Sequence, residues 1–441
     1  MKNVKLNKLW DSLHSSYWFL PSLMVLGGII LAFSTLTLDR MDKVKMEEWS
    51  WIYTGGPEGA RSLLSAIAGS MVSVAATAFS ITIVALQLAS ANFGPRLLRN
   101  FMQDTGNQIV LGTFIGTFIY CLLILRTVRG EDYKLFVPQL SVTVGLLLAL
   151  ASIAVLIFFI HHASTIIQAS YVIENVSIDF HRAIENLYPE KVGEGKDKLE
   201  RIVAEIPENF ADAAYPIRST KTGYLQFIDH EQLMKIAGKY DLLLHLKSQP
   251  GEFIIKGKIL VMSYPDKRVN KKVIDEIDKV FIFGKERTEQ QDIEFPIAQL
   301  VEIAMRALSP GINDPFTAIR CLDRITSGLC HLCQRKFPSP YRYDQEKNLR
   351  IIAETVSFSE LVDSAFNQIR IYGKSDLAVN LKLLDSIAII ASYTDNPKYK
   401  SHLYKHAEMI FRGSREGLSE EQDCLNVQEE YQRVIHAIEN C

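Results

Sequence analysis

Four long apolar runs near the start of the chain constrain its fold more than any other feature. None of them contains Asp, Glu, Lys or Arg, and each is close to the roughly 20 residues that a helix needs to cross the hydrocarbon core of a bilayer. Inside hydrocarbon an unpaired backbone group costs several kcal/mol, so such segments must be helical. We therefore expect a four-helix transmembrane domain within residues 1–163, with spans at Tyr17–Leu38, Leu63–Asn92, Ile109–Leu125 and Val137–His161.

The rest of the chain has the composition of a water-soluble region. Residues 1–163 hold 12 Lys/Arg and 9 Asp/Glu, which leaves 36 and 41 of the totals 48 and 50 for residues 164–441. Neither part has the strong basic field that nucleic-acid binding requires. Of the six cysteines, all except Cys121 in the third run are scattered over the soluble region. Such sparse cysteines exclude a disulfide scaffold and indicate a reducing compartment.

The orientation in the membrane follows only in part from the charges. An even number of spans puts both termini on one side; if that side is the cytoplasm, the inner segments carry five Lys/Arg and the outer loops seven. The positive-inside rule therefore does not decide the orientation from the loops alone. However, Lys2, Lys5 and Lys8 precede the first span, and the apolar run after them is longer than the core of a cleavable signal, about 7–15 residues. Together with the reduced-type cysteines, this favours cytoplasmic termini.

The second span carries small and hydroxyl-bearing residues along one helical face. One interpretation is close helix packing, because small residues let backbones approach and hydroxyls bond across. The other is the lining of a water-filled pore in a homo-oligomer. Just after the span, Arg96 and Arg99 lie about one turn apart, where they would either anchor at headgroup level or ring the pore mouth and favour anions. The stripe comprises Ser62, Ser65, Gly69, Ser73, Thr77, Ser80 and Gln87.

The fourth span is predicted to continue beyond the bilayer. No Pro or Gly interrupts the chain between Gly145 and Pro189, and about 45 residues at 1.5 Å each make a helix about 65 Å long. Its protruding half is apolar at alternating steps of four and three, from Ile166 to Leu187, which is typical of a seam for a partner helix in the same chain or a neighbouring subunit. Residues 164–212 are therefore assigned to a helical extension and linker.

Residues 213–285 have the pattern of a small α+β module. Tyr215–Ser219 and Gly223–Ile228 predict strands, and Asp229 is the expected N-cap of the next helix. The stretch Pro250–Leu260 resembles the hairpin of barrel-sandwich modules that carry biotin or lipoate. The Met-Lys-Met or Asp-Lys-Ala turn that accepts these groups is missing, so we expect no prosthetic group and no other cofactor.

Residues 286–441 predict a helical domain that begins with a sharply capped corner. Pro310 and Gly311 end one helix, and Asp314 with Pro315 begins the next. The corner is either purely structural or a ligand or interface site, since sites favour such loops. Its candidate residues are Asp292, Glu294, Arg306, Asn313 and Asp314. A C-terminal helical bundle should follow, with helices at Asp344–Tyr372, Ser375–Tyr393, Pro397–Arg412 and Ser419–Asn440.

Two stretches resemble a known family. The run 306–318, Arg-Ala-Leu-Ser-Pro-Gly-Ile-Asn-Asp-Pro-Phe-Thr-Ala, and the second-span block 79–90, Phe-Ser-Ile-Thr-Ile-Val-Ala-Leu-Gln-Leu-Ala-Ser, are similar to the bacterial predicted-membrane-protein family called domain of unknown function 2254. The resemblance extends over nearly the whole chain. It implies a multi-pass protein of the bacterial inner membrane and implies no established activity.

Motifs of known enzymes are missing from the sequence. There is no Gly-rich phosphate loop, no dinucleotide fingerprint, no His-Glu-x-x-His and no Gly-x-Ser-x-Gly, so an enzyme is unsupported. Cys330-x-x-Cys333 lacks the second pair that a structural zinc site needs, and buried free thiols are expected there. Two classes remain: an oligomeric channel or transport protein with span two along the pathway, and a membrane-anchored sensor or scaffold whose cytoplasmic domain binds a ligand or partner. The permeant ion or ligand is not specified by any motif.

Overall fold

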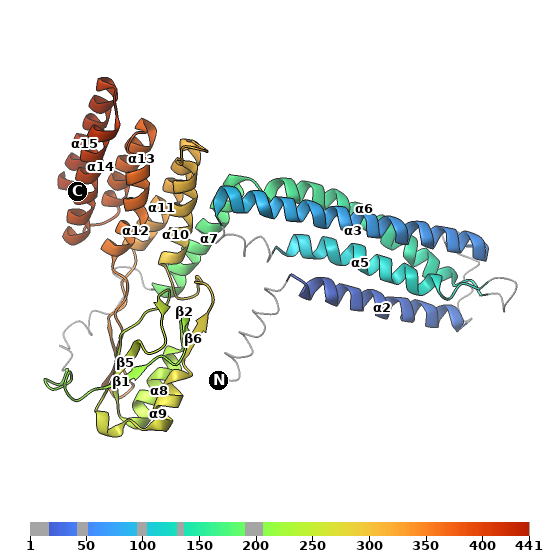
Figure 1. The fold of residues 1–441 in the computed structure, drawn as a ribbon, viewed down its shortest axis with the longest axis horizontal. Helices are drawn as coiled ribbons and strands as arrows, with labels where there is room; N and C mark the ends of the chain where they lie inside the picture. Colours follow the sequence, from blue (N-terminus) through green and yellow to red (C-terminus); the bar gives the residue numbers. More distant parts are fainter. Residues whose placement is uncertain (1–16, 42–51, 95–103, 130–135, 190–205, 441) are drawn as a thin grey trace. The chain divides into compact units, whose positions relative to one another are not determined.

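A computed structural model describes residues 17–41, 52–94, 104–129, 136–189 and 206–440. The chain divides into two compact units, residues 1–171 and 172–441. Within the described residues there are 13 helices and 8 strands, which confirms the predicted fold class: four apolar helices first, then a soluble α+β region with a small β module and C-terminal helices (Figure 1). The two units are described separately below.

The first unit contains four helices that are long and apolar enough to cross a membrane, α2 (Phe19–Arg40), α3 (Pro57–Phe93), α5 (Thr105–Leu125) and α6 (Gln139–Ile166). They confirm the four predicted spans within a few residues. Figure 1 shows the four helices running side by side. Helix α5 contacts each of the other three and is more than half buried, whereas the others are about one-quarter buried. The unit is thus organised around α5.

Glycines allow α2 and α5 to approach closely. A β-carbon at Gly28 would lie 2.9 Å from the carbonyl oxygen of Gly116, and one at Gly112 would meet Met24 and the backbone of Pro21. The Gly112-x-x-x-Gly116 motif is therefore a contact surface between these two helices, as small residues at membrane helix interfaces usually are.

Two carboxylates tie the ends of the spans together. The Asp39 carboxylate, at the end of α2, accepts hydrogen bonds from the Leu140 amide at 2.9 Å and from the Ser141 amide and hydroxyl at 3.0 and 2.5 Å. It thereby caps the first turn of α6. At the other end, the Asp104 side chain caps α5 and lies 2.7 Å from His162 Nε2.

The fourth span does not continue as a single helix. Helix α6 ends at Ile166, and a separate helix, α7 (Ala169–Leu187), begins after a turn. The prediction of one uninterrupted helix was wrong, because a helix can also end where there is neither Pro nor Gly. The hydroxyls of Ser164 and Thr165 and the amide of Gln168 bond to carbonyls one turn earlier in the chain; such bonds bend helices, although the same bonds in α3 leave that helix unbroken.

The predicted seam on α7 has its partner in the same chain. Ile173, Phe180 and Ile184 are buried, and the partner is α11 (Pro315–Cys333), where Phe180 lies against Gly328. The ring of His181 stacks on that of His331 on α11, with centroids 5.5 Å apart.

The β module of the second unit contains two sheets. The five-stranded sheet has the order β1 (Tyr215–Arg218), β5 (Ile259–Tyr264), β3 (Leu243–Leu246), β8 (Leu349–Ile352), β7 (Tyr341–Tyr343). The three-stranded sheet has the order β4 (Phe253–Ile254), β2 (Gly223–Ile228), β6 (Phe281–Gly284). Strands β3 and β8 are parallel, and the other pairs are antiparallel.

Two expectations about this module are corrected. Strands β4 and β5 lie in different sheets, so Pro250–Leu260 does not form the hairpin of a barrel-sandwich module. The helix expected from Asp344 begins only at Phe358, because residues 341–352 form β7 and β8. Asp344 accepts hydrogen bonds from the amides of Glu346 and Asn348, which shapes a turn between these strands.

Helices α8 (His230–Tyr240) and α9 (Lys271–Asp278) belong to the β module and share its core. Asp229 caps α8 through the Gln232 amide at 3.0 Å, as predicted. The helical part comprises α10 (Glu294–Ala307), α11, α12 (Phe358–Tyr372), α13 (Leu377–Ser392), α14 (Pro397–Gly417) and α15 (Glu421–Asn440). Asp314 caps α11 through the Thr317 amide at 3.1 Å and hydroxyl at 2.6 Å, which confirms the predicted cap.

Candidate functional site

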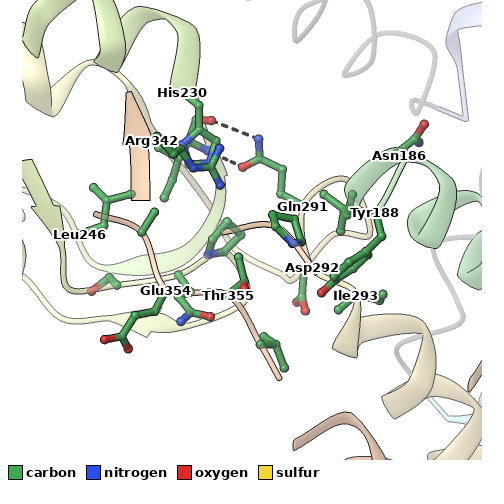
Figure 2. A pocket seen from close by; sticks show the side chains of 18 of the residues that line it. Asn186, Tyr188, His230, Leu246, Gln291, Asp292, Ile293, Arg342, Glu354 and Thr355 are labelled. Carbon is green, nitrogen blue, oxygen red and sulfur yellow. Dashed lines mark hydrogen bonds between the residues drawn. The ribbon is translucent and has the colours of Figure 1, made fainter. Parts of the chain in front are cut away.

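The second unit contains an open cavity of about 460 Å³ with both polar and apolar walls. Its wall is built from the end of α7, the start of α8, the segment before α10, strand β7 and the strip that follows β8 (Figure 2). A volume of this size suits a small-molecule ligand. The polar lining residues are Asn186, His230, Ser248, Gln249, Gln291, Asp292, Arg342, Glu354 and Thr355.

His230 contributes an imidazole without a partner. It is the first residue of α8, directly after the Asp229 cap. Its Nδ1 atom is buried and has no hydrogen-bond partner within the described part of the chain. Burial, and then the positive charge of Arg342, lower its pKa from 6.5 to about 4. The ring is therefore neutral at pH 7.

Arg342, on β7, lies beside His230 in Figure 2. Its Nε atom is buried without a partner, and no carboxylate of the described residues pairs with its guanidinium. Burial lowers its pKa below the usual value, but an arginine stays charged at physiological pH. Arg342 is half-buried, and removing part of a cation from water without a counter-charge is unfavourable to the fold.

Two other arginines of this unit, Arg350 and Arg287, are paired with carboxylates, whereas Arg370 on α12 resembles Arg342 in having a buried Nε without a partner in the described residues. Arg350 binds Asp241 at 2.6 Å and Asp344 at 2.7 Å. Arg287 makes a bidentate pair with Asp292 at 2.6 and 2.8 Å. Asp292 faces the cavity, but Arg287 already neutralises its charge.

A second, more open cavity of about 680 Å³ shares His230 and Arg342 with the first. The Tyr343 hydroxyl beside it is buried and has no partner in the described residues. Two adjoining cavities therefore meet at one imidazole and one guanidinium. Both groups are able to donate hydrogen bonds, so the arrangement suits an anionic group of a ligand.

A glutamine clamp fixes the cavity wall. Gln291 accepts a hydrogen bond from the Ile228 amide at 2.8 Å and donates one to the Ile228 carbonyl at 3.1 Å, as the dashed lines in Figure 2 show. The clamp joins the segment before α10 to the end of β2. These two bonds fix the position of His230, two residues beyond Ile228, relative to Asp292, the residue after Gln291.

The five corner residues predicted from the sequence lie at opposite ends of α10. Asp292 and Glu294 lie at its start, whereas Arg306, Asn313 and Asp314 lie at or beyond its end. A helix of 14 residues separates its ends by about 20 Å. Of the five, only Asp292 lines the cavity. Arg306 pairs with Glu302 at 3.6 Å, and Asn313 has a positive φ of 52°.

The stripe on α3 lies on the exposed face of its unit. The side that packs inside the unit is instead rich in alanine, including Ala68, Ala75 and Ala78. Hydroxyls of the stripe bond to carbonyls one turn earlier in their own helix. Arg96 and Arg99 lie outside the described residues. The exposed members of the stripe are Ser62, Ser65, Gly69, Ser73, Thr77, Ser80 and Gln87.

The thiols of the Cys-x-x-Cys pair are buried and free. Burial raises the pKa of Cys330 to about 11 and that of Cys333 to about 12. Both are thus protonated at pH 7 and unreactive as nucleophiles.

Sequence reasoning missed His230 and Arg342. The signal for His230 was its place directly after a predicted cap, and the signal for Arg342 was its place between Tyr341 and Tyr343 in a short alternating run. Neither signal indicates that the two residues meet, because that depends on the parallel pairing of β3 with β8.

The fold and the cavity define a membrane protein with four candidate spans and a soluble α+β region. Over residues 14–388 the chain matches the family described as "Predicted membrane protein (DUF2254)", and it belongs to that family. The uncharacterised proteins Rv1290c of Mycobacterium tuberculosis and Mb1321c of Mycobacterium bovis are each 30% identical to it over 427 residues, which is 94% of this chain and 79% of each relative. No solved structure matches the chain.

Proposed function

We propose that this protein is a membrane-anchored sensor of the bacterial inner membrane whose soluble region binds a small organic anion in the His230–Arg342 cavity. The observation that carries the proposal is the half-buried Arg342, whose Nε atom is buried without a partner and whose guanidinium pairs with no carboxylate of the described residues. A bound carboxylate or phosphate would supply the missing counter-charge and accept charge-assisted hydrogen bonds.

The energetics favour a ligand over an empty site. A buried donor without a partner costs roughly 1–3 kcal/mol, and more when it is charged. Proteins usually satisfy such a group, as the paired Arg350 and Arg287 do here, although the Nε of Arg370 is also left without a partner in the described residues. An unpaired Arg342 therefore lowers the stability of the ligand-free protein, and an anion that reaches it regains this free energy as affinity.

The remaining lining indicates the size and character of the ligand. Besides polar groups, the cavity has apolar walls from Tyr188, Pro250, Ile293 and Val356. A ligand with one anionic group and a partly apolar body would use both kinds of surface. A free inorganic anion would fill only a small part of a cavity of about 460 Å³.

The binding proposal is tested by ligand-dependent protection of the purified full-length protein in detergent. Inorganic phosphate, succinate and adenosine monophosphate form a series of increasing size. We expect the larger organic anions to raise the unfolding midpoint of the soluble region, since a ligand that binds only the native state stabilises it. The Arg342→Gln variant should lose this response.

The matched control is Arg218→Gln. Arg218 lies on β1 of the same module, is exposed and donates to the Gly257 carbonyl. This variant should respond like the wild type. Equal responses of the wild type and Arg342→Gln, or no response to any of the three anions, would refute the cavity as an anion site.

A second candidate function is an oligomeric pathway along α3, as in a channel. The exposure of the hydroxyl stripe favours this candidate. Within the unit the alanine side of α3 is buried, whereas the side with the stripe is exposed. Neighbouring subunits that place this stripe around a common axis would give a wall of hydroxyls able to solvate a permeant ion. Cytoplasmic termini would put the anion cavity on the cytoplasmic side in either case.

The pathway is tested with single cysteines at Ser73, Thr77 and Ser80 in a Cys121→Ser background. A small water-soluble thiol reagent should modify all three, and Ala78→Cys on the packed side should stay protected. Peptide mass spectrometry separates these sites from thiols of the soluble region. Uniform protection of the stripe, together with a monomer in native mass spectrometry, would eliminate this candidate.

A further inference from the structure

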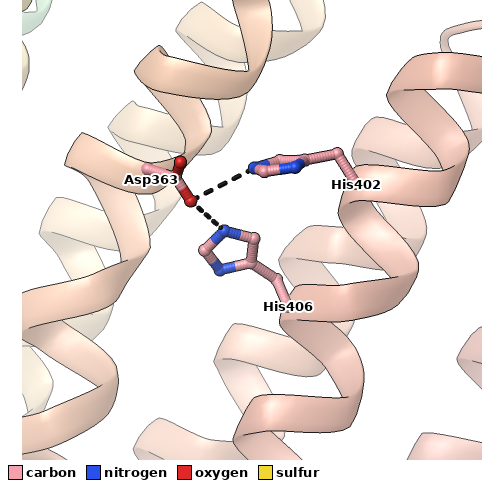
Figure 3. A group of neighbouring side chains, drawn as sticks. All are labelled: Asp363, His402 and His406. Atoms are coloured by element: carbon pink, nitrogen blue, oxygen red, sulfur yellow. Dashed lines mark hydrogen bonds and ion pairs between the residues drawn. The ribbon is translucent and has the colours of Figure 1, made fainter.

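The helical part of the second unit brings together a carboxylate and two imidazoles. Asp363 lies on α12, and His402 and His406 lie on α14 (Figure 3). The two histidines are four residues apart, so they project from the same face of their helix. Figure 3 shows both rings directed toward the Asp363 carboxylate.

The distances place three potential ligand atoms around one point. Asp363 Oδ1 lies 3.1 Å from His402 Nε2 and 2.8 Å from His406 Nε2. One ligand atom from each residue falls within 4.8 Å of the others. Among the described residues this is the only such group of three.

Burial differs across the group in a way that leaves one side open. The His406 side chain is fully buried and that of His402 is 20% exposed, whereas the Asp363 side chain is 44% exposed. An ion between them would be held rigidly from the bundle side and would remain accessible to water from the carboxylate side.

The tautomer of His406 decides whether its Nε2 atom donates a hydrogen bond or offers a lone pair. If Asp363 accepts from both rings, His406 must carry its proton on Nε2. Its Nδ1 is then a buried lone pair, and it has no partner in the described part of the chain. The same Nε2 atom could instead give its lone pair to a metal ion, with the proton moved to Nδ1, which lacks a partner among the described residues in either arrangement.

We propose that Asp363, His402 and His406 bind a divalent transition-metal ion, with zinc as the reference case. Two imidazole nitrogens and one carboxylate oxygen are a known ligand set for zinc, iron and their neighbours, and an unsuitable one for magnesium or calcium, which prefer oxygen only. A water molecule would complete the coordination on the open side. The ion would crosslink α12 and α14.

The site is independent of the anion cavity and is tested on the full-length protein. The chelator-treated protein is titrated with Co²⁺, whose visible absorption reports ligand type and coordination number. We expect one saturable site per chain without a thiolate-to-cobalt charge-transfer band. Asp363→Asn and His402→Gln should each weaken binding by at least about tenfold, which is the scale seen when supporting groups of metal sites are removed.

The control is His436→Gln, an exposed histidine on α15 of the same bundle, which should bind Co²⁺ like the wild type. Thermal unfolding provides a second measurement, because Zn²⁺ should raise the unfolding temperature of the wild type and the control. It should not raise that of the two ligand variants. Equal binding by all variants, a thiolate band that indicates Cys330 and Cys333, or no saturable binding would each overturn the proposal.

Discussion

Acid should destabilise the soluble region through His230. The folded-state pKa of this histidine is about 4, below its ordinary 6.5. The unfolded chain therefore binds more protons than the folded chain between these values, and stability falls as the pH drops through this window. From the two pKa values, lowering the pH from 7 to 5 removes about 2 kcal/mol of stability.

The assay must report on the soluble region alone. All four tryptophans lie at or before Trp51, in the membrane unit, so tryptophan fluorescence does not follow the unfolding of the soluble region. Urea unfolding measured by pulse proteolysis follows the soluble region, because the fragments that the two units protect from the protease differ in size. Other histidines with lowered pKa values, such as His245 and His406, contribute equally to the wild type and to His230→Gln. Their effects cancel in the difference between the two.

We expect the wild type to lose about 2 kcal/mol more than His230→Gln between pH 7 and pH 5. A bound anion should reduce this loss, because a nearby negative charge favours the protonated ring and raises its pKa. If both proteins lose the same stability, His230 is not buried as described, and the reasoning about the cavity wall fails with it.

Asp39→Ala should lower the stability of the membrane unit by roughly 1–2 kcal/mol, since it removes the cap of α6 at Ser141. Tryptophan fluorescence during thermal unfolding would detect the loss, and an unchanged midpoint would contradict the capping role. Asp314→Ala should cost about 1 kcal/mol, whereas Asp314→Asn should retain the cap to Thr317 and restore stability, as measured by urea unfolding. If Asp314→Asn folds stably yet changes function, the corner has a binding role. A reporter that is active only in the periplasm should give no signal when fused after Cys441, and a strong signal would invert the predicted topology.

The sequence was sufficient to predict the elements whose signals are local. The four spans needed only apolar length. The caps Asp229 and Asp314 needed only the residue type before a helical pattern. These features depend on neighbours within a few residues, so one sequence is enough to read them.

Features that depend on distant pairing could not be predicted in the same way. The segment Leu349–Ile352 follows a polar turn and was predicted to be helical. It forms a strand because it pairs with β3, which lies about 100 residues earlier in the chain. The cavity residues His230 and Arg342 meet only through that sheet. Likewise, Asp363 and His406 come together only after α12 packs on α14. The division of the chain at residues 163, 212 and 285 remains a prediction.

The most direct test of the anion cavity is a cryo-EM structure of the full-length protein with the anion that stabilises it most. We expect density for its carboxylate or phosphate within hydrogen-bond distance of the Arg342 guanidinium, with the body of the ligand against Tyr188 and Ile293. Density for the anion at another place, with no ligand at Arg342, would contradict the central claim.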